Sequence, residues 1–521
     1  VSPLRDNELQ DALQQLVNSE LIFRRGPPPD VSYTYKHALV QDAAYESLLK
    51  SQRQQFHKRI AETLESEDAE NATNEPGLLA HHFSAAGIAE RAIGYWQAAA
   101  QRSMQTLATG DAITCLDRAL ESVAALPEGA DRDNLEVDIR ISLSMAHLTE
   151  KGWAAEEIPI TLRPAERLCE RGDNLFRTLT IKWNLLQHEF IHCNFSAALE
   201  IITDSLAAAE QSADMRFKVM AWNMATYVYW ATGQLRKAEI YGAQLLEAYD
   251  VERDASLMVA AGGLDAKVMT YGAMTYIYWS LGRPEAAKAA VEEQLQHARS
   301  LDHALTLIFA LNHGCDVLAY MGEAELLIER STEARGIARE QGNQFVEISV
   351  CGCHGGMGYL YAGDFATADK ELTTGFDMWA ATGGKWQLGQ GYMLRAEAAL
   401  GLGQVDRARE LIETAITVTE ETGHVFWAAE THRVHGEILG HASFGDTVAA
   451  EASFRRAIAI AQEQAAKMLE LRATIGLARL WQSQGKLTEA RDLLAPVYGW
   501  FSEGFDTADL KDAKALLDTM R

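Results

Sequence analysis

Histidine and cysteine residues form two short groups whose spacing could bind a metal ion. The segment CGCHGG places Cys351, Cys353 and His354 close together, while His432 and His435 lie one helical turn apart. Structural zinc sites use four ligands, and the first group has no second ligand pair at zinc spacing. A third histidine, His441, follows the second group, but the sequence places no acidic or cysteine partner beside it. Cys351 and Cys353 would also point to different faces of a helix. We therefore interpret both groups as helix-packing residues and predict no metal site.

The sequence contains none of the common catalytic or nucleotide-binding patterns. It has no GxxxxGK[ST] phosphate-binding loop, no Gly-x-Ser-x-Gly nucleophile motif, and no paired metal-binding aspartates in a strand-rich stretch. These patterns supply the phosphate contacts, the nucleophile and the metal ligands of the corresponding enzymes. We therefore predict no catalytic residue and no cofactor in this chain.

Two nearly identical aromatic segments are the strongest candidates for a binding site. The chain reads TYVYW at residues 226–230 and TYIYW at residues 275–279, and a glycine follows each copy (Gly233 and Gly282). If these glycines form the turns between paired helices, Tyr229 and Tyr278 occupy the packing position between the helices. The other rings of each segment then lie on a different face of the first helix.

That second face could line a groove. Tyr227 and Trp230 are three residues apart and share a helix face, as do Tyr276 and Trp279. Asn223 lies four residues before Tyr227 and offers an amide that can bond a peptide backbone. Four amphipathic rings and this amide would suit an extended peptide or a flat ligand. We predict that these five residues bind a protein or peptide partner in a concave groove.

The alternative is that the same rings form core. Aromatic residues at helical spacing pack in the interior more often than they bind ligands. An adjoining helix, for example the glycine-rich insertion at Leu257–Lys267, could cover them. Truncation of the tryptophans distinguishes the two interpretations, because core tryptophans contribute several kcal/mol to stability.

A regular spacing of turn residues predicts the architecture that positions these rings. Glycine, or asparagine once, recurs along the chain, and the longest interval, from Gly233 to Gly282, is where we place the insertion. Both residue types tolerate the left-handed conformation that ends a helix, and a nearly fixed period of about 40 residues is typical of a solenoid. The ladder comprises Gly110, Gly152, Asn194, Gly233, Gly282, Gly322, Gly363, Gly403, Gly445 and Gly485.

Within each period the pattern resembles the tetratricopeptide repeat. Its first helix carries aromatic positions and its second carries small residues, and Trp222, Tyr229 and Ala238 fill three of these positions. The period of this chain is longer than the family's unit of about 34 residues, which indicates longer helices. We expect an all-α, right-handed superhelix of tetratricopeptide-like helix pairs (an α-solenoid).

Composition and charge restrict the classes of partner. The 521 residues include only 10 prolines and 48% hydrophobic residues, and the net charge is −26. An acidic surface repels phosphate backbones and anionic lipid, and no apolar run is long enough to span a membrane. The six cysteines show no disulfide spacing. We expect a cytoplasmic protein that binds neither nucleic acid nor membrane.

The start of the chain, from position 1 to position 66, does not follow the repeat. It reads as a helix, two short strands joined by GPPPD, and two further helices, which is the order of a winged-helix unit. DNA binding would be the usual role of that fold, but a basic recognition helix is missing. We therefore expect a small winged-helix-like unit with another role.

A second resemblance concerns both ends of the chain. The segment YTYKHALVQDAAYESLLKSQRQQFHKRIAETLE resembles the end of the ATPase module of signal-transduction NTPases with numerous domains. Together with LLAHHFSAAGIAERAIGYWQAAAQRSM and the C-terminal ARDLLAPVYGWFSEGFDTADLKDAKALLDTM, it is similar to bacterial class III adenylate/guanylate cyclases that carry an ATPase and a tetratricopeptide tail. The opening VSPLRDNELQ, without Met, reads as the middle of a domain. We expect a C-terminal fragment of such a signalling protein.

The resemblance implies a separate role for each segment of the chain. Residues 1–70 would be the winged-helix-like end of the ATPase module, 76–495 the repeat array, and 496–521 a C-terminal capping helix. ATP and Mg²⁺ would bind only in the upstream part, and His37, between strand YTY and the next helix, would contact the nucleotide's phosphates; its alternative role is to cap or pack that helix. The array would be a non-catalytic sensor that contacts its own upstream ATPase and cyclase domains. The alternatives are the sensor tail of an ATP-dependent transcriptional activator and a self-associating scaffold.

Overall fold

The computed structural model describes residues 4–26, 31–67, 75–106, 108–170, 174–260 and 263–520, without the side chains of residues 256–260. Internal contacts divide the chain into two compact units. Unit 1 comprises residues 1–150 and 161–172, and unit 2 comprises residues 151–160 and 173–521. This division falls inside the predicted repeat array. No helix among the described residues is both long and apolar enough to cross a membrane.

Unit 1 begins with the helix, strands and helices expected from the sequence. The strands pair antiparallel, with Ile22 opposite Tyr35 and Arg25 opposite Ser32. Of the predicted GPPPD turn, residues 27–30 lie outside the described residues. The elements are α1 (Asp6–Asn18), β1 (Ile22–Arg25), β2 (Ser32–Tyr35), α2 (Ala38–Glu46), α3 (Lys50–Glu67), α5 (Pro76–Ala86), α6 (Ala89–Gln105), α7 (Thr109–Val123) and α8 (Ala130–Lys151), and α9 (Glu157–Cys169) follows with residues in both units.

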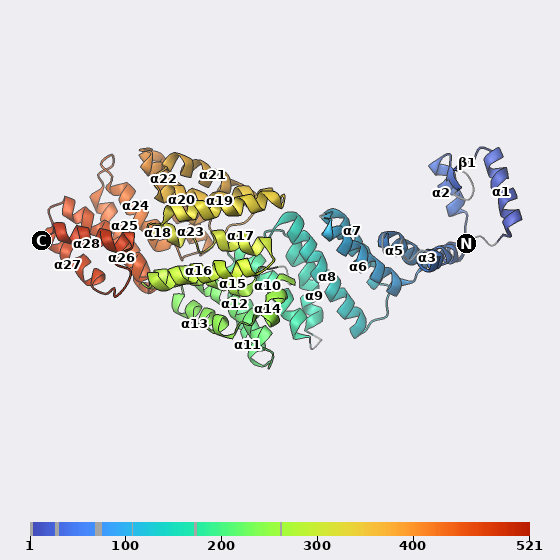
Figure 1. Cartoon of the computed structure of the whole chain (residues 1–521), viewed down its shortest axis with the longest axis horizontal. Helices are drawn as coiled ribbons and strands as arrows, with labels where there is room; N and C mark the ends of the chain where they lie inside the picture. Colours follow the sequence, from blue (N-terminus) through green and yellow to red (C-terminus); the bar gives the residue numbers. More distant parts are fainter. Residues whose placement is uncertain are drawn as a thin grey trace. The chain divides into compact units, whose positions relative to one another are not determined.

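Unit 2 is a succession of helix pairs, which confirms the predicted all-α solenoid (Figure 1). Its first half contains α10 (Leu175–Ile191), α11 (Phe195–Glu210), α12 (Met215–Ala231), α13 (Leu235–Ala248), α14 (Val251–Ala260), α15 (Ala266–Ser280), α16 (Pro284–Ser300), α17 (Ala304–Asn312) and α18 (Val317–Tyr320). Its second half contains α19 (Ala324–Glu340), the π-helical turn η1 (Val346–Val350), α20 (Cys351–Tyr361), α21 (Phe365–Ala381), α22 (Leu388–Gly401), α23 (Val405–Thr422), α24 (Ala428–Gly440), α25 (Thr447–Glu463), α26 (Lys467–Ser483), α27 (Leu487–Tyr498) and α28 (Ala508–Thr519).

Small residues allow the paired helices to approach closely. A Cβ atom added at Gly356 of α20 would lie 2.8 Å from Leu372 Cγ, and one added at Gly436 of α24 would lie 2.9 Å from the Phe454 ring. A larger side chain at either position would therefore push the neighbouring helix away. The small-residue position of the second helices, predicted above at Ala238, is occupied by completely buried alanines: Ala238, Ala287, Ala368, Ala408, Ala450 and Ala490.

The predicted turn ladder is confirmed from Gly233 onward and corrected at two earlier positions. Gly152, Gly233, Gly282 and the later glycines have positive φ. Gly110 does not, because it lies in the first turn of α7. Asn194 has φ −83° at the N-cap of α11, and the left-handed residue is its neighbour Cys193, with φ 58°. The sequence rule therefore located this turn correctly to within one residue.

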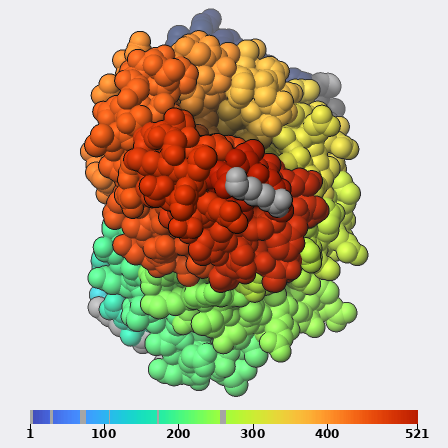
Figure 2. Space-filling view, turned by 90° about the vertical axis from the view of Figure 1, so that its left-hand side faces the viewer, coloured from blue at the N-terminus to red at the C-terminus, as the bar shows by residue number. Residues whose placement is uncertain are grey.

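The C-terminal segment of unit 2 contacts the turn between α15 and α16. Glu503 accepts a hydrogen bond of 3.1 Å from the backbone N–H of Glu285, at the start of α16. A Cβ atom at Gly282 would lie 2.5 Å from the Trp500 ring, so glycine leaves the room that this ring needs. Figure 2 shows the C-terminal helices, in red, seated directly on the green segment that contains α13 to α16. Within this unit the solenoid therefore curls so that its C-terminal segment packs on the α15–α16 pair.

Candidate ligand-binding cavity

Unit 2 contains a cavity of about 180 Å³ whose wall is mostly aromatic and aliphatic. Aromatic side chains that are distant in the sequence meet there. Its aromatic lining residues are Trp153, Trp183, Phe190, Tyr227, Phe309, Phe376, Trp379 and Trp386.

One stripe of α10 supplies much of the wall. Trp183, Leu186, Gln187, Phe190 and Ile191 all line the cavity, and their spacing of three or four residues places them on one side of the helix. The helix begins with the Asn174 side chain accepting a hydrogen bond from the Arg177 backbone N–H, 3.1 Å away, which satisfies an otherwise free donor at the N-terminus.

The turn between α21 and α22 closes another side of the cavity. The backbone N–H groups of Lys385 and Trp386 both donate to the Ile191 carbonyl oxygen, at 2.8 and 2.9 Å. Gln387 adopts a left-handed conformation with φ 62°, which is uncommon for a side chain of this kind. These contacts hold the Trp386 ring 5.3 Å from that of Phe190, centroid to centroid.

A π-helical turn contributes a third part of the wall. In η1, Val346, Ser349 and Val350 line the cavity, and Ser349 donates a hydrogen bond of 2.9 Å to the Gly375 carbonyl oxygen. Single π-helical turns occur frequently at functional sites, because the extra residue changes the direction of the side chains. The turn is thus an irregular backbone feature at the cavity, as is the left-handed Gln387.

Four buried donor atoms belong to residues of the cavity wall. Within the described part of the chain, Trp153 Nε1, Trp183 Nε1, Trp386 Nε1 and Gln187 Nε2 have no hydrogen-bond partner. Buried polar atoms are nearly always hydrogen-bonded, and each exception costs about 1–3 kcal/mol. An indole N–H can only donate. These donors therefore lie within residues of the wall, and the largely apolar lining itself is suited to an apolar group.

Burial shifts the pKa of one group in the cavity wall, Cys353, and of one group beside it, His313. Burial raises the pKa of the Cys353 thiol far above its usual value, so the thiolate that a nucleophile requires is not formed at neutral pH. Burial also lowers the pKa of His313 to about 3, and its ring stacks near Tyr227. Tyr227 is held in place by its hydroxyl, which donates a bond of 2.9 Å to the Met269 carbonyl oxygen.

The structure corrects the predicted position of the aromatic rings. Trp230, Tyr276 and Trp279 have no exposed surface and are packed in the interior of unit 2, not on an open groove. Trp230 lies 5.0 Å from Tyr276 and 5.2 Å from Phe426, centroid to centroid. Trp279 stacks on Tyr320 at 4.9 Å.

The structure places Asn223 and Tyr227 in different surroundings. Asn223 is completely buried, and its amide donates to Thr270 Oγ1 at 3.0 Å and to the Ala266 carbonyl oxygen at 3.3 Å. Its amide N–H groups therefore join α12 to α15 and are not available to a bound backbone. Tyr227 is the member of the predicted set that lines the cavity, and its contact with a ligand stays a prediction.

The remaining candidate residues lie elsewhere. His37 is exposed at the N-cap of α2, without a side-chain capping bond. Cys351 accepts a bond of 3.6 Å from the Asn312 amide, and His435 Nδ1 lies 3.0 Å from Ser453 Oγ. Phe426 and Trp427 pack against the rings of the twin aromatic segments. Sequence analysis did not predict this contact, because the two residues lie several helix pairs further along the chain.

Sequence reasoning also missed a group formed by Glu156, His188 and His192. Each offers one potential ligand atom, and these atoms lie within 4.8 Å of one another. The sequence does show His188 and His192 four residues apart, and this spacing places two side chains on one face of a helix. Glu156 is separated from this pair by the whole of α9, so its proximity depends on the fold.

Sequence comparison finds a distant relative of the chain. No protein-family model matches the chain. An uncharacterized protein of Rhizobium meliloti (strain 1021) is 25% identical over 492 residues, which are 91% of this chain and 46% of that protein. The chain therefore spans about half the length of this relative.

Among solved structures, a Rap protein complexed with competence and sporulation factor has a TM-score of 0.52 at 14% identity, over 72% of this chain and 98% of the Rap chain. The fold is a tetratricopeptide-like solenoid. A signal transduction ATPase with numerous domains from Pyrococcus horikoshii, with a tetratricopeptide repeat sensor, gives a TM-score of 0.29 at 15% identity, over 97% of this chain and 58% of that chain.

Proposed function

We propose that the chain is a non-catalytic sensor module that binds a peptide or protein segment through the cavity of unit 2. The observation that carries this proposal is the apolar wall with four buried donors that lack partners, Trp153 Nε1, Trp183 Nε1, Trp386 Nε1 and Gln187 Nε2, within the residues that the structure describes. Apolar wall and unpaired donors together favour a ligand with an apolar side chain and nearby carbonyl oxygens.

The size of the cavity supports a peptide anchor over a complete small molecule. Pockets for drug-sized ligands have volumes of about 300–1,000 Å³, whereas this cavity has about 180 Å³. One or two apolar side chains of a longer segment would fill it. The Rap protein of similar fold was solved with competence and sporulation factor, and we extend the capture of a partner to this chain.

Regulation of an upstream catalytic module is the second part of the proposal. Unit 1 exposes several large apolar side chains, among them Phe23 at 47%, Leu39 at 81% and Leu49 at 68%. An ATPase module that packs on this unit would cover them. In our proposal that module, which binds ATP and Mg²⁺, controls an adenylate or guanylate cyclase in a cytoplasmic protein. An ATP-dependent transcriptional activator is the alternative parent, and a self-associating scaffold is the alternative role.

A cavity-filling variant tests the binding site. Val350→Trp should place an indole in the cavity and abolish binding of N-acetyl-4-fluorophenylalanine amide, a probe with one apolar ring and two carbonyl acceptors. We expect ¹⁹F line broadening of the probe with the wild-type protein and at least a tenfold weaker effect with the variant.

Val448→Trp is the matched control, because Val448 is 81% exposed on α25 in the same unit. It should bind the probe as the wild type does. Equal broadening by all three proteins would mean that the probe binds outside the cavity, and would contradict the proposed site.

His37 offers a test of the regulatory part. In a full-length parent with an ATPase module, His37→Ala should change the retention of ADP or the basal activity, because in our proposal this imidazole, exposed at the start of α2, contacts the nucleotide's phosphates. Nucleotide content after purification and basal turnover measure these two quantities. Unchanged values of both would remove His37 from the mechanism, without affecting the cavity.

A further inference from the structure

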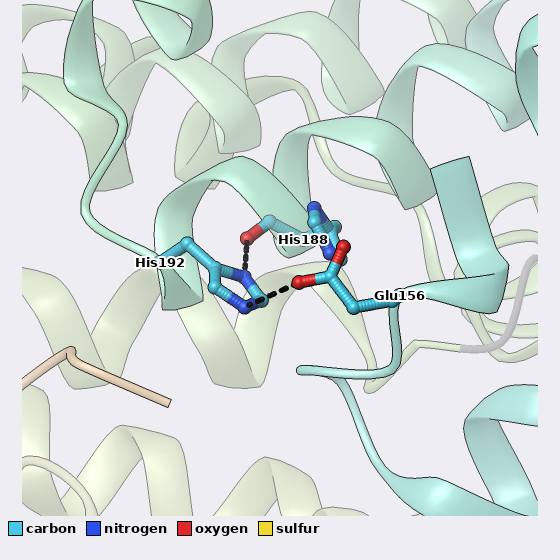
Figure 3. A group of neighbouring side chains, drawn as sticks. All are labelled: Glu156, His188 and His192. Carbon is cyan, nitrogen blue, oxygen red and sulfur yellow. Dashed lines mark hydrogen bonds and ion pairs between the residues drawn. The ribbon is translucent and has the colours of Figure 1, made fainter. Parts of the chain in front are cut away.

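Glu156, His188 and His192 lie together at one end of α10, in unit 2 (Figure 3). Their potential ligand atoms are all within 4.8 Å of one another. We propose that these three side chains bind a divalent metal ion of the zinc class. This inference is independent of the ligand proposed for the cavity.

The helix places both imidazoles on one side. His188 and His192 are four residues apart, and His192 is the C-cap residue of α10. The centroids of the two rings are 4.2 Å apart. A pair of histidines at this spacing is a common way for a helix to present two nitrogen ligands to one ion.

A backbone contact orients the second imidazole. His192 Nδ1 lies 2.9 Å from the His188 carbonyl oxygen, and because that oxygen can only accept, Nδ1 carries the hydrogen. In the neutral ring the lone pair is then on Nε2. This nitrogen faces Glu156 Oε1 at 3.7 Å (Figure 3). Histidine ligands of metals are usually oriented by such a bond from their other nitrogen.

The distance between Glu156 and His192 is close to that between neighbouring ligands of a tetrahedral site. Zinc bonds of about 2.0–2.1 Å to nitrogen and oxygen place neighbouring ligand atoms about 3.4 Å apart. The pair Glu156 Oε1 and His192 Nε2 is already near this value. The Glu156 side chain is 77% exposed, so it can rotate toward the histidines without disturbing packed residues.

The ligand types select the class of metal. Imidazole ligands favour zinc, cobalt and nickel ions, whereas magnesium and calcium prefer sites made of oxygen atoms only. Three protein ligands leave a fourth tetrahedral position for water or another group.

Binding would connect two parts of the cavity wall. Glu156 lies three residues after Trp153, and His188 follows Gln187; both Trp153 and Gln187 line the cavity. A metal ion at this position would fix the segment 151–160 to α10. The bound ion would therefore also order the part of the cavity wall that contains Trp153 and Gln187, two of the residues with unpaired donors.

The experiment uses the full chain after treatment with a chelator, titrated with Co²⁺ and then with Zn²⁺ in competition. We expect one Co²⁺ per chain with the visible absorption of a tetrahedral ion, and displacement by Zn²⁺. Glu156→Gln and His192→Ala should each weaken Zn²⁺ binding by at least about tenfold, since even loss of a residue behind the ligands costs about 10–100-fold.

Glu200→Gln is the control, because Glu200 is an exposed carboxylate on the neighbouring helix α11. It should bind Zn²⁺ as the wild type does. Because Glu156 and His192 are not core residues, the folded state of each variant can be checked by its circular dichroism. Absence of the Co²⁺ spectrum, or equal Zn²⁺ affinity in all four proteins, would overturn the proposal and leave an ordinary contact between Glu156 and His192.

Discussion

Trp230→Ala should lower the free energy of unfolding by about 3–5 kcal/mol, the range measured for buried aromatic residues that are truncated to alanine. The ring has no exposed surface. It packs between Tyr276 of the next helix pair and Phe426, which belongs to the turn before α24. Removal of the indole therefore opens a cavity where distant parts of the solenoid meet.

Denaturant unfolding followed by circular dichroism measures this loss as a difference between the midpoints of variants of one protein. Trp279→Ala should behave alike, since Trp279 stacks on Tyr320 in the interior. Val448→Ala, at a position that is 81% exposed, should change stability by less than about 0.5 kcal/mol. Near-native stability of Trp230→Ala combined with loss of partner binding would instead favour the groove predicted from the sequence.

These tryptophans show what the sequence could and could not predict. Periodicity correctly placed Trp230 and Tyr276 apart from Tyr229, which is half-buried and stacks on Tyr241 of α13. It could not tell which residues would cover that face, because the cover includes Phe426. Contact between residues so far apart depends on the accumulated rotation of many repeats, and no local pattern encodes that rotation.

In the candidate sites, too, local patterns could be predicted from the sequence and contacts between distant residues could not. The stripe of apolar residues on α10, from Trp183 to Ile191, is a local pattern and could be recognised in the sequence. The bond from the Trp386 backbone to Ile191 joins the end of α10 to the turn between α21 and α22, which are far apart in the sequence. The cavity between them, with its unpaired donors, could therefore be found only in the folded chain. The same holds for Glu156 beside His192.

A buried network of ion pairs connects α24, α26 and the C-terminal helix α28. Arg472 of α26 donates to Glu430 Oε1 at 2.8 Å and to Asp509 Oδ1 at 2.7 Å. Burial acts to raise the pKa of Glu430, but Arg433 and Arg472 hold it below its usual value. Burial raises the pKa of Asp509, against the effect of Arg472. Glu430 also pairs with Arg433, whereas the ion pair of Asp509 is with Arg472, so loss of the Arg472 charge should affect Asp509 most.

Arg472→Met should destabilise the protein by about 3–5 kcal/mol, the cost of removing one partner from a buried ion pair. Glu430 retains its contact with Arg433 at 2.9 Å, whereas Asp509 loses the cation that balances its buried carboxylate. Added Asp509→Asn should recover about half of the loss or more, because the neutral amide costs less to bury. Denaturant midpoints of the two variants and the wild type measure both effects.

The surface ion pair Arg479–Asp512 also joins α26 to α28, and its side chains are 52% and 39% exposed. It serves as the matched control. Arg479→Met should cost at most about 1 kcal/mol, because water and salt screen an exposed ion pair. If Arg472→Met cost no more than this control, the buried network would not hold α28 in place. If instead Arg472→Met were strongly destabilising and Asp509→Asn gave no recovery, the loss would come from the contact between the Arg472 guanidinium and the Tyr320 ring, whose centroid lies 5.2 Å from the guanidinium carbon.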